Sequence, residues 1–276
     1  MKDDEIFHRL TEISAGGISG RGPSLLCTDG LWTAALDIIR AARNTAVITG
    51  FFIASADAPE TDGPSGSVVL ARALMRAGIE TDIWTDARCL GVLSICAESI
   101  SFPADRVRNV SDGIGRAKQP GLLIYVERLG RAADGAYYDM RGKDVSKVTA
   151  PLDEYALNGA SRVIGIGDGG NEAGMGNYME RLCVMMPDYA MCLSSVRADV
   201  CIPVDVSNWG AYALSAALSR DCGVWLGQTQ AEEAAMLEAM ASAGAVDGTS
   251  KKNALSVDGF DMSKQLEIVS SLRSLF

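Results

Sequence analysis

The fold of this chain is decided by the stretch that runs Arg162-Val163-Ile164-Gly165-Ile166-Gly167-Asp168-Gly169-Gly170-Asn171-Glu172-Ala173-Gly174-Met175-Gly176-Asn177. It begins as an apolar strand, and its second half has the pattern of a helix that starts directly after the glycines. Because glycine lacks a Cβ, it adopts positive φ angles and lets the backbone approach a ligand closely. A loop this rich in glycine, which also holds Asp168, Asn171 and Glu172, predicts the floor of a small-molecule site.

Apolar strands alternate with amphipathic helices on both sides of this stretch. Strands are predicted at residues 46–53, 79–85, 121–126, 162–166 and 199–204, and helices at 31–43, 66–77, 88–97, 152–158, 172–186, 209–219, 229–243 and 263–275. Near-continuous apolar strands separated by helices are typical of a parallel sheet covered on both faces. The sequence therefore predicts an α/β fold, a three-layer, mostly parallel sheet with helices on both faces.

No break in composition divides the 276 residues, so we expect a single α/β domain over 1–276, with an irregular insertion over 128–150. The net charge of −10 argues against binding to nucleic acid. No apolar run approaches the ~18 residues of a membrane span. The acidic N-terminus predicts neither a secretory signal nor a transit peptide. We expect a cytoplasmic protein that does not bind a membrane; a homo-oligomer is compatible with these data.

The cysteine and histidine content limits the kinds of catalytic and metal site that this chain can form. The seven cysteines are an odd number without a Cys-x-x-Cys motif, as is typical of buried free thiols in a reducing compartment. The chain has a single histidine, His8, near its N-terminus. This excludes Ser-His-Asp chemistry and histidine-rich zinc sites. An enzyme with this sequence would take its acids and bases from carboxylates, Lys, Tyr or Cys.

Each predicted strand is followed by at least one carboxylate. Ligands of open parallel sheets lie outside the carboxyl ends of the strands, so we expect these side chains to converge on one rim. The carboxylates are Glu60 and Asp62 after the first strand, Asp86 after the second, Glu127 after the third, Asp168 and Glu172 after the fourth, Asp205 after the fifth, and Asp247 in a late turn.

Carboxylates gathered in one place repel and raise each other's pKa unless a cation neutralises them. Mg²⁺ or Mn²⁺, which prefer oxygen ligands, are the natural neutralisers. We expect Asp62, Glu127, Asp168 and Asp247 to bind such a divalent cation. Arginines are the alternative: Arg128, Arg131 and Arg141 could neutralise the rim, or could hold the carboxylate or phosphate of an anionic small-molecule substrate.

Simpler interpretations exist for each motif. Asp-Gly pairs are ordinary turn formers, and Glu172 could favour the first turn of a helix through its dipole. The spacing of Gly165, Gly167 and Gly170 fits a dinucleotide-binding fingerprint, but the acidic residue expected about 20 residues later is missing from a strand end. Ser207 or Asn208 could cap the helix that follows, or could form a pocket wall.

Five motifs together resemble a known family. They are Thr49-Gly50-Phe51, residues 60–64, residues 127–142, the glycine-rich stretch and residues 206–210. Over roughly Leu25 to Phe260 the chain is similar to the C-terminal domain of the D-glutamate cyclase family, formerly a domain of unknown function. The resemblance implies a carbon–oxygen lyase that removes water from D-glutamate to give 5-oxo-D-proline. Mitochondrial members carry a further N-terminal domain and a targeting peptide, neither of which is predicted here.

The resemblance leads to a hypothesis about individual residues. General acid–base catalysis is assigned to Glu60, Asp62, Asp168 and Glu172, with metal assistance from Mn²⁺ or Mg²⁺. Substrate binding is assigned to Gly167, Gly169, Gly170, Asn171, Arg131, Arg141, Ser207 and Asn208. Two other functions stay open: a different metal- or phosphate-dependent small-molecule enzyme, and a non-catalytic amino-acid-binding domain.

Overall fold

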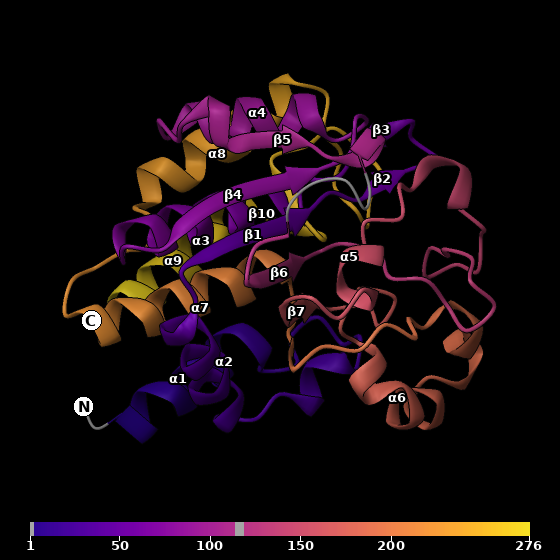
Figure 1. Cartoon of the computed structure of the whole chain (residues 1–276). Helices are drawn as coiled ribbons and strands as arrows, with labels where there is room; N and C mark the ends of the chain where they lie inside the picture. Colours follow the sequence, from indigo (N-terminus) through magenta and orange to yellow (C-terminus); the bar gives the residue numbers. More distant parts are fainter. Residues whose placement is uncertain (1–2, 114–118) are drawn as a thin grey trace.

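Six parallel strands form the central sheet of the computed structural model, which describes residues 3–113 and 119–276. Their order across the sheet is β5-β4-β1-β6-β7-β8 (Figure 1). The strands are β1 Asn44–Thr49, β4 Glu80–Thr85, β5 Val107–Asn109, β6 Leu122–Val126, β7 Arg162–Gly167 and β8 Val200–Pro203. In register, Ile48 of β1 lies beside Trp84 on one side and Tyr125 on the other. The carboxyl ends of all six strands therefore lie along one edge.

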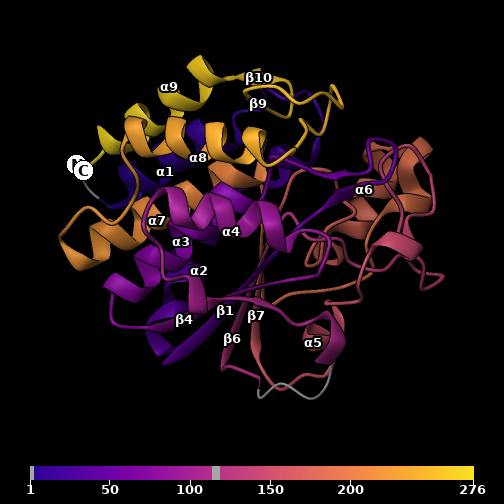
Figure 2. The same ribbon diagram turned by 90° about the horizontal axis from the view of Figure 1, so that it is seen from above.

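One face of the sheet carries most of the helices (Figure 2). They are α1 Asp3–Ala15, α2 Gly30–Ala41, α3 Pro64–Arg76, α4 Leu90–Ser99, α7 Ser207–Cys222, α8 Gln230–Ser242 and α9 Met262–Arg273. Val47, Ile124 and Ile166 point from the strands into the core of this layer. α3 and α7 pack against each other, and the Tyr212 hydroxyl donates to Ser65 Oγ at 2.7 Å.

The opposite face has a thinner cover. Successive side chains of a strand point to opposite faces, so Ile48 and Tyr125 belong to a second core with Leu152 and Tyr155. The short helix α5, Glu154–Leu157, and irregular chain lie over this face (Figure 2). The predicted three-layer α/β fold is confirmed, with two outer layers of unequal thickness.

Short elements complete the fold. They are the strands β2 Phe52–Ile53, β3 Ala58–Pro59, β9 Ser256–Val257 and β10 Phe260–Asp261; the helix α6 Met179–Met185; and the 3₁₀ turns Pro23–Leu26, Ala104–Arg106, Ser111–Gly113, Ser146–Val148, Gly176–Tyr178 and Pro187–Cys192. Residues 128–150 hold one of these turns and an isolated bridge between Tyr138 and Asp144, and are otherwise irregular. Across the described ranges, no helix has both the length and the apolar character needed to cross a bilayer.

Two of the predicted elements are wrong in detail. The strand expected at 46–53 ends at Thr49, because Gly50 takes a φ of 118° and turns the chain into a separate hairpin. The helix expected at 172–186 begins only at Met179. Gly174 has a φ of 106°, which no helix contains, and its amide donates to Val196 O. The glycine loop therefore leads into irregular chain rather than into a helix.

Gly165 provides a test of the packing that fixes this loop. A Cβ at Gly165 would lie 2.6 Å from Ala173 O and 2.9 Å from Gly174 Cα, which are both backbone atoms. Overpacking of this kind costs about 1–3 kcal/mol, so Gly165→Ala should lower the free energy of urea unfolding by that amount. Gly91 on α4 is the control, since a Cβ there meets open space. Gly91→Ala should change stability by at most about 0.5–1 kcal/mol, as a gain. Equal effects of the two substitutions would contradict this account of the loop.

Candidate functional site

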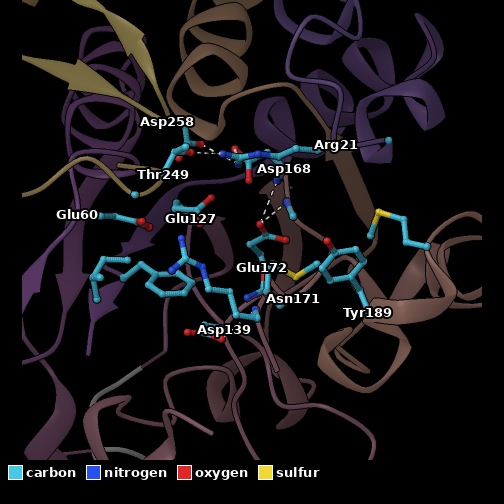
Figure 3. Close-up of a pocket in the computed structure, with 18 of the residues that line it drawn as sticks. Arg21, Glu60, Glu127, Asp139, Asp168, Asn171, Glu172, Tyr189, Thr249 and Asp258 are labelled. Carbon is cyan, nitrogen blue, oxygen red and sulfur yellow. Dashed lines mark hydrogen bonds and ion pairs between the residues drawn. The ribbon is translucent and has the colours of Figure 1, made fainter. Parts of the chain in front are cut away.

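A cleft of about 870 Å³ opens at the carboxyl edge of the sheet. Its walls come from seven separate segments of the sequence, several of which are labelled in Figure 3. They are Gly20–Leu25, Phe51–Glu60, Glu127, Asp139–Val145, Asp168–Glu172, Met185–Tyr189 and Gly248–Asp258. The cleft therefore lies where ligands bind in open parallel sheets.

Six carboxyl groups gather at the inner end of this cleft, and we call them the acid floor. Five of them line the cleft, and Asp62 lies close behind. The acid floor comprises Glu60, Asp62, Glu127, Asp168, Glu172 and Asp258. Five of them are buried residues. Asp258 is half-buried as a whole residue, although only 7% of its side chain is exposed. Asp62, Glu127, Asp168 and Glu172 come together as the sequence predicts.

Arg21 is the cation that enters the acid floor. Its Nη1 lies 2.8 Å from Asp168 Oδ2 and 2.8 Å from Asp258 Oδ2 (Figure 3). The two carboxylates raise the pKa of Arg21, so the guanidinium stays charged. One arginine thus offsets the repulsion between a residue of the glycine loop and a residue of the late turn near the C-terminus.

The loop that carries Arg21 is held by Asp205, which follows β8. The Asp205 carboxylate accepts hydrogen bonds from the backbone N–H groups of Gly17, Ile18 and Ser19 and from Ser19 Oγ, at 2.7–3.2 Å. Asp205 is fully buried. It therefore serves as an anchor for the N-terminal loop rather than as a group that faces the cleft.

The glycine loop wraps around a carboxylate of its own chain. Glu172 accepts hydrogen bonds from the backbone N–H groups of Asp168, Gly169 and Gly170 at 3.1, 2.7 and 2.8 Å. A Cβ at Gly167 would lie 2.8 Å from Glu172 Oε2, so only glycine allows this approach. From the sequence, Gly169 and Gly170 are expected to bind substrate. In the structure their backbone N–H groups bind the Glu172 side chain instead.

Asp62 and Asn208 tie two helices together behind the acid floor. Asp62 accepts from the N–H groups of Ser207 and Asn208 at the start of α7, at 2.9 and 2.8 Å. Asn208 Oδ1 accepts in return from the N–H groups of Gly63 and Gly66 at the start of α3, at 3.0 and 2.7 Å. Free N–H groups and the dipole at a helix N-terminus both favour such acceptors. Ser207 Oγ donates to Glu127 Oε2 at 2.6 Å, which extends the network to the cleft.

Burial keeps protons on part of the acid floor. It is the main cause of the raised pKa of Glu60, Glu127 and Asp168, and neighbouring carboxylates add to it. Burial and Asp258 raise the pKa of Asp62 to about 8, although the α7 amides oppose this. Arg21 opposes the rise at Asp168. At neutral pH the cluster therefore offers both proton donors and proton acceptors.

Backbone strain is concentrated at the same place. Glu127, Lys251 and Asp258 take φ angles of 45°, 60° and 54°, in the left-handed region that side chains disfavour. All three residues line the cleft. Conformations of this kind cost about 1 kcal/mol or more each and cluster at binding and catalytic sites. The strained positions are therefore an independent indication that the cleft is functional.

The acid floor can accommodate a divalent cation. Two groups bring one oxygen from each member within 4.8 Å of the others: Asp62, Asp168 and Asp258, and Glu127, Asp168 and Glu172. Within the described ranges, Glu60 Oε1 and Asp168 Oδ2 are buried without a hydrogen bond, although Asp168 Oδ2 has its ion pair with Arg21. An all-oxygen donor set suits Mg²⁺ or Mn²⁺.

The remaining predicted residues lie in three settings. Gly169, Asn171 and Arg141 line the cleft. Gly167, Gly170, Ser207 and Asn208 are buried behind it in the networks described above. Arg131 does not line the cleft; its Nε lies 2.8 Å from Asp153 Oδ2. Asp247 accepts hydrogen bonds from nearby residues of the late turn: Thr249, Ser250, Ser256 and Gly259.

Three cleft residues were missed by sequence reasoning: Arg21, Lys251 and Asp258. Arg21 stands between Gly20 and Gly22, and such glycine flanks are a local signal for an exposed functional side chain. Lys251 and Asp258 have no comparable local signal, since it is the tertiary fold that brings the late turn to the cleft.

Fold and site together define the class: an α/β protein with a cleft at the carboxyl ends of a parallel sheet, lined by buried acids. Comparison with known sequences gives the family. The family model "D-glutamate cyclase-like, C-terminal" matches residues 10–273, so this chain belongs to that family, and the expected resemblance is confirmed.

Individual relatives agree with this placement. The chain is 34% identical over 222 residues to the human (Homo sapiens) mitochondrial D-glutamate cyclase. The aligned region covers 70% of this chain and 35% of the human protein. The chain thus spans about a third of that relative. Among solved structures, an exopolyphosphatase-related protein from Bacteroides fragilis has a TM-score of 0.49 at 8% identity, over 91% of this chain and 58% of that chain. This likeness has no bearing on function.

The role of Glu172 in shaping the glycine loop can be tested by Glu172→Gln. The amide has one acceptor oxygen for three N–H donors and places its NH₂ group against one of them. Hydrogen bonds to a charged group contribute about 1.5–3 kcal/mol, so we expect a loss of about 2 kcal/mol in urea unfolding at pH 7. Glu180→Gln on the exposed side of α6 is the control and should be neutral. A stable Glu172→Gln protein would show that the loop does not depend on this carboxylate.

The raised pKa of Glu60 predicts a pH-dependent stability. Above the usual pKa of a glutamate, the unfolded chain releases this proton while the folded chain keeps it, so stability falls as pH rises. Glu60→Gln removes this effect at a side chain with a bare buried oxygen. In EDTA, the variant should match the parent near pH 5 and exceed it by about 1–2 kcal/mol at pH 8.5. Glu98→Gln, on the exposed side of α4, should show no such trend. A constant difference across this pH range would contradict the raised pKa.

Proposed function

We propose that the chain is a D-glutamate cyclase-like lyase that dehydrates D-glutamate to 5-oxo-D-proline at the acid floor. The observation that carries the proposal is the gathering of buried carboxyl groups with raised pKa beside a single arginine, in a cleft at the strand ends. Membership of the D-glutamate cyclase-like family supports the reaction type.

The reaction needs groups that both donate and accept protons. The α-nitrogen of D-glutamate attacks the carbon of the γ-carboxyl group, a carbon–nitrogen bond forms, and one carbon–oxygen bond of that group breaks. The two protons lost by the nitrogen equal the two gained by the departing water. A carboxyl group that remains protonated at neutral pH can protonate the leaving oxygen, and an ionised carboxylate can take a proton from the ammonium.

The structure suggests how these tasks divide. Glu60 and Glu127, whose pKa values are raised by burial, are the proposed proton donors. Asp168 is the proposed base. Burial raises its pKa as well, but Arg21, 2.8 Å from Asp168 Oδ2, opposes that rise, and this oxygen accepts no hydrogen bond from the described part of the chain. Ring closure is intramolecular, so correct positioning of the two reacting ends supplies much of the acceleration.

Other residues hold the substrate and the site. Lys251 lines the cleft close enough to Glu60 to oppose the rise in its pKa, and we propose that its ammonium binds the α-carboxylate. Asp62 and Glu172, whose oxygens already accept backbone N–H groups, keep α7 and the glycine loop in place.

A divalent cation is part of the proposal. Asp168 belongs to both groups of carboxylates that can bind Mn²⁺ or Mg²⁺, with Asp62 and Asp258 or with Glu127 and Glu172. When bound, such a cation would act as a Lewis acid toward the γ-carboxyl group.

The direct test is to incubate the purified protein with D-glutamate and Mn²⁺ or Mg²⁺ and to measure 5-oxoproline by chiral chromatography. We expect product from the D-enantiomer. Asp168→Asn should lower kcat/KM at least about 100-fold, since general acid–base catalysis contributes about 10²–10⁴-fold. Asp37→Asn, exposed on α2, is the matched control.

Two results would contradict the proposal. An absence of product under every metal condition would remove the cyclase assignment from this chain. Binding of D-glutamate in calorimetry without any turnover would instead indicate an amino-acid-binding domain.

A further inference from the structure

The cleft is much larger than the substrate named above. D-Glutamate has about 10 non-hydrogen atoms, whereas clefts of about 300–1,000 Å³ enclose drug-sized ligands. At about 870 Å³ this cleft lies near the upper end of that range. Unless a ligand extends beyond the acid floor, most of the cleft stays filled with water.

The part of the cleft away from Asp258 has a different chemical character. Figure 3 shows Asp139 and Tyr189 on the opposite side of the acid floor from Asp258 and Thr249. Phe51, Phe52 and Met140 also line the cleft. We call this region, with Arg141, the outer subsite. Its apolar and aromatic surface suits an aliphatic side chain.

Arg141 gives the outer subsite a positive charge. Its backbone N–H donates to Asp139 Oδ1 at 2.9 Å, and within the described parts of the chain its guanidinium forms neither an ion pair nor a hydrogen bond. Asn171 Nδ2 donates to Tyr138 O at 2.9 Å and so ties this turn to the glycine loop. Arg141 is exposed and lines the cleft, so its guanidinium is available to a carboxylate.

The two parts of the cleft also differ in charge, because the acid floor holds carboxyl groups and the outer subsite holds Arg141. Free D-glutamate would bring both of its carboxylates toward the acid floor, where like charges repel. If the γ-carboxyl group is joined as an amide to an amino acid, the second negative charge moves onto that amino acid. It then faces Arg141 rather than the acid floor.

From these observations we infer that the outer subsite binds an apolar amino acid joined to the γ-carboxyl group of D-glutamate, so that the chain also cyclises γ-D-glutamyl amino acids. The inference rests on the proposed cyclase function. The α-nitrogen attacks the γ-carbonyl carbon, the new ring bond forms, and the amide bond to the second amino acid breaks. The two protons lost by the attacking nitrogen are gained by the leaving nitrogen, so the products are 5-oxo-D-proline and a free amino acid.

The experiment compares three substrates: D-glutamate, γ-D-glutamyl-leucine and γ-D-glutamyl-methylamide. The two amides have the same reacting bond, and only the leucine conjugate carries an apolar side chain and a carboxylate for Arg141. We expect kcat/KM for the leucine conjugate to exceed that for the methylamide at least about tenfold, with leucine and 5-oxoproline released in equal amounts. Arg141→Met should reduce this ratio to near one. Arg43→Met, exposed at the opposite edge of the sheet, should leave the ratio unchanged.

The results separate the two proposals. Turnover of D-glutamate without turnover of either amide overturns the outer subsite and leaves the cyclase function standing. No 5-oxoproline from any of the three substrates removes the cyclase function itself. Equal rates for the two amides, or a ratio that Arg141→Met does not change, would also overturn the assignment of the outer subsite to an amino acid.

Discussion

The arrangement of this protein depends on keeping buried carboxyl groups close together despite their mutual repulsion. Six of them lie at the carboxyl edge of one parallel sheet, and burial removes most of the water that would screen them. Three devices offset the repulsion. Arg21 pairs with Asp168 and Asp258, backbone amides surround Glu172, and the N-terminus of α7 receives Asp62. Burial still raises the pKa of Glu60, Asp62, Glu127 and Asp168, so the partners offset the repulsion only in part.

This constraint explains why the site is built from so many loops. The glycine loop supplies two carboxylates and the amides that bind Glu172, but the guanidinium beside Asp168 comes from the N-terminal loop, and the amides that bind Asp62 come from α7. Asp62, just before α3, accepts from the Asn208 N–H of α7, and Asn208 Oδ1 accepts from the Gly66 N–H of α3. These bonds join α3 to α7, and the same two helices pack against the sheet. The packing of the helical layer and the geometry of the acid floor are therefore fixed by the same contacts.

Sequence reasoning predicted those parts of the molecule that follow local rules. The strands β1, β4, β6, β7 and β8 are largely buried, and the carboxylates that follow β1, β6 and β7 converge because parallel strands share an edge. Two expected members do not join them: Asp86 after β4 pairs with Arg128, and Asp205 after β8 binds the N-terminal loop. The edge strand β5 is short and half-exposed, so its pattern is weak. The helix expected from residue 172 was wrong because Gly174 needs a positive φ and Glu172 is bound by the preceding amides. Lys251 and Asp258 reach the cleft only through tertiary contacts, which no local sequence pattern indicates.

The pinning of the N-terminal loop by Asp205 has a consequence for biosynthesis. The amides of Gly17 and Ser19 meet their acceptor only after nearly two hundred further residues have been made, and Arg21 meets Asp258 later still. A growing chain on the ribosome can pair its central strands early, yet the loop at residues 17–21 must wait for Asp205, and Arg21 for Asp258. The cleft is thus completed only after residue 258 has been made, when the sheet is already whole.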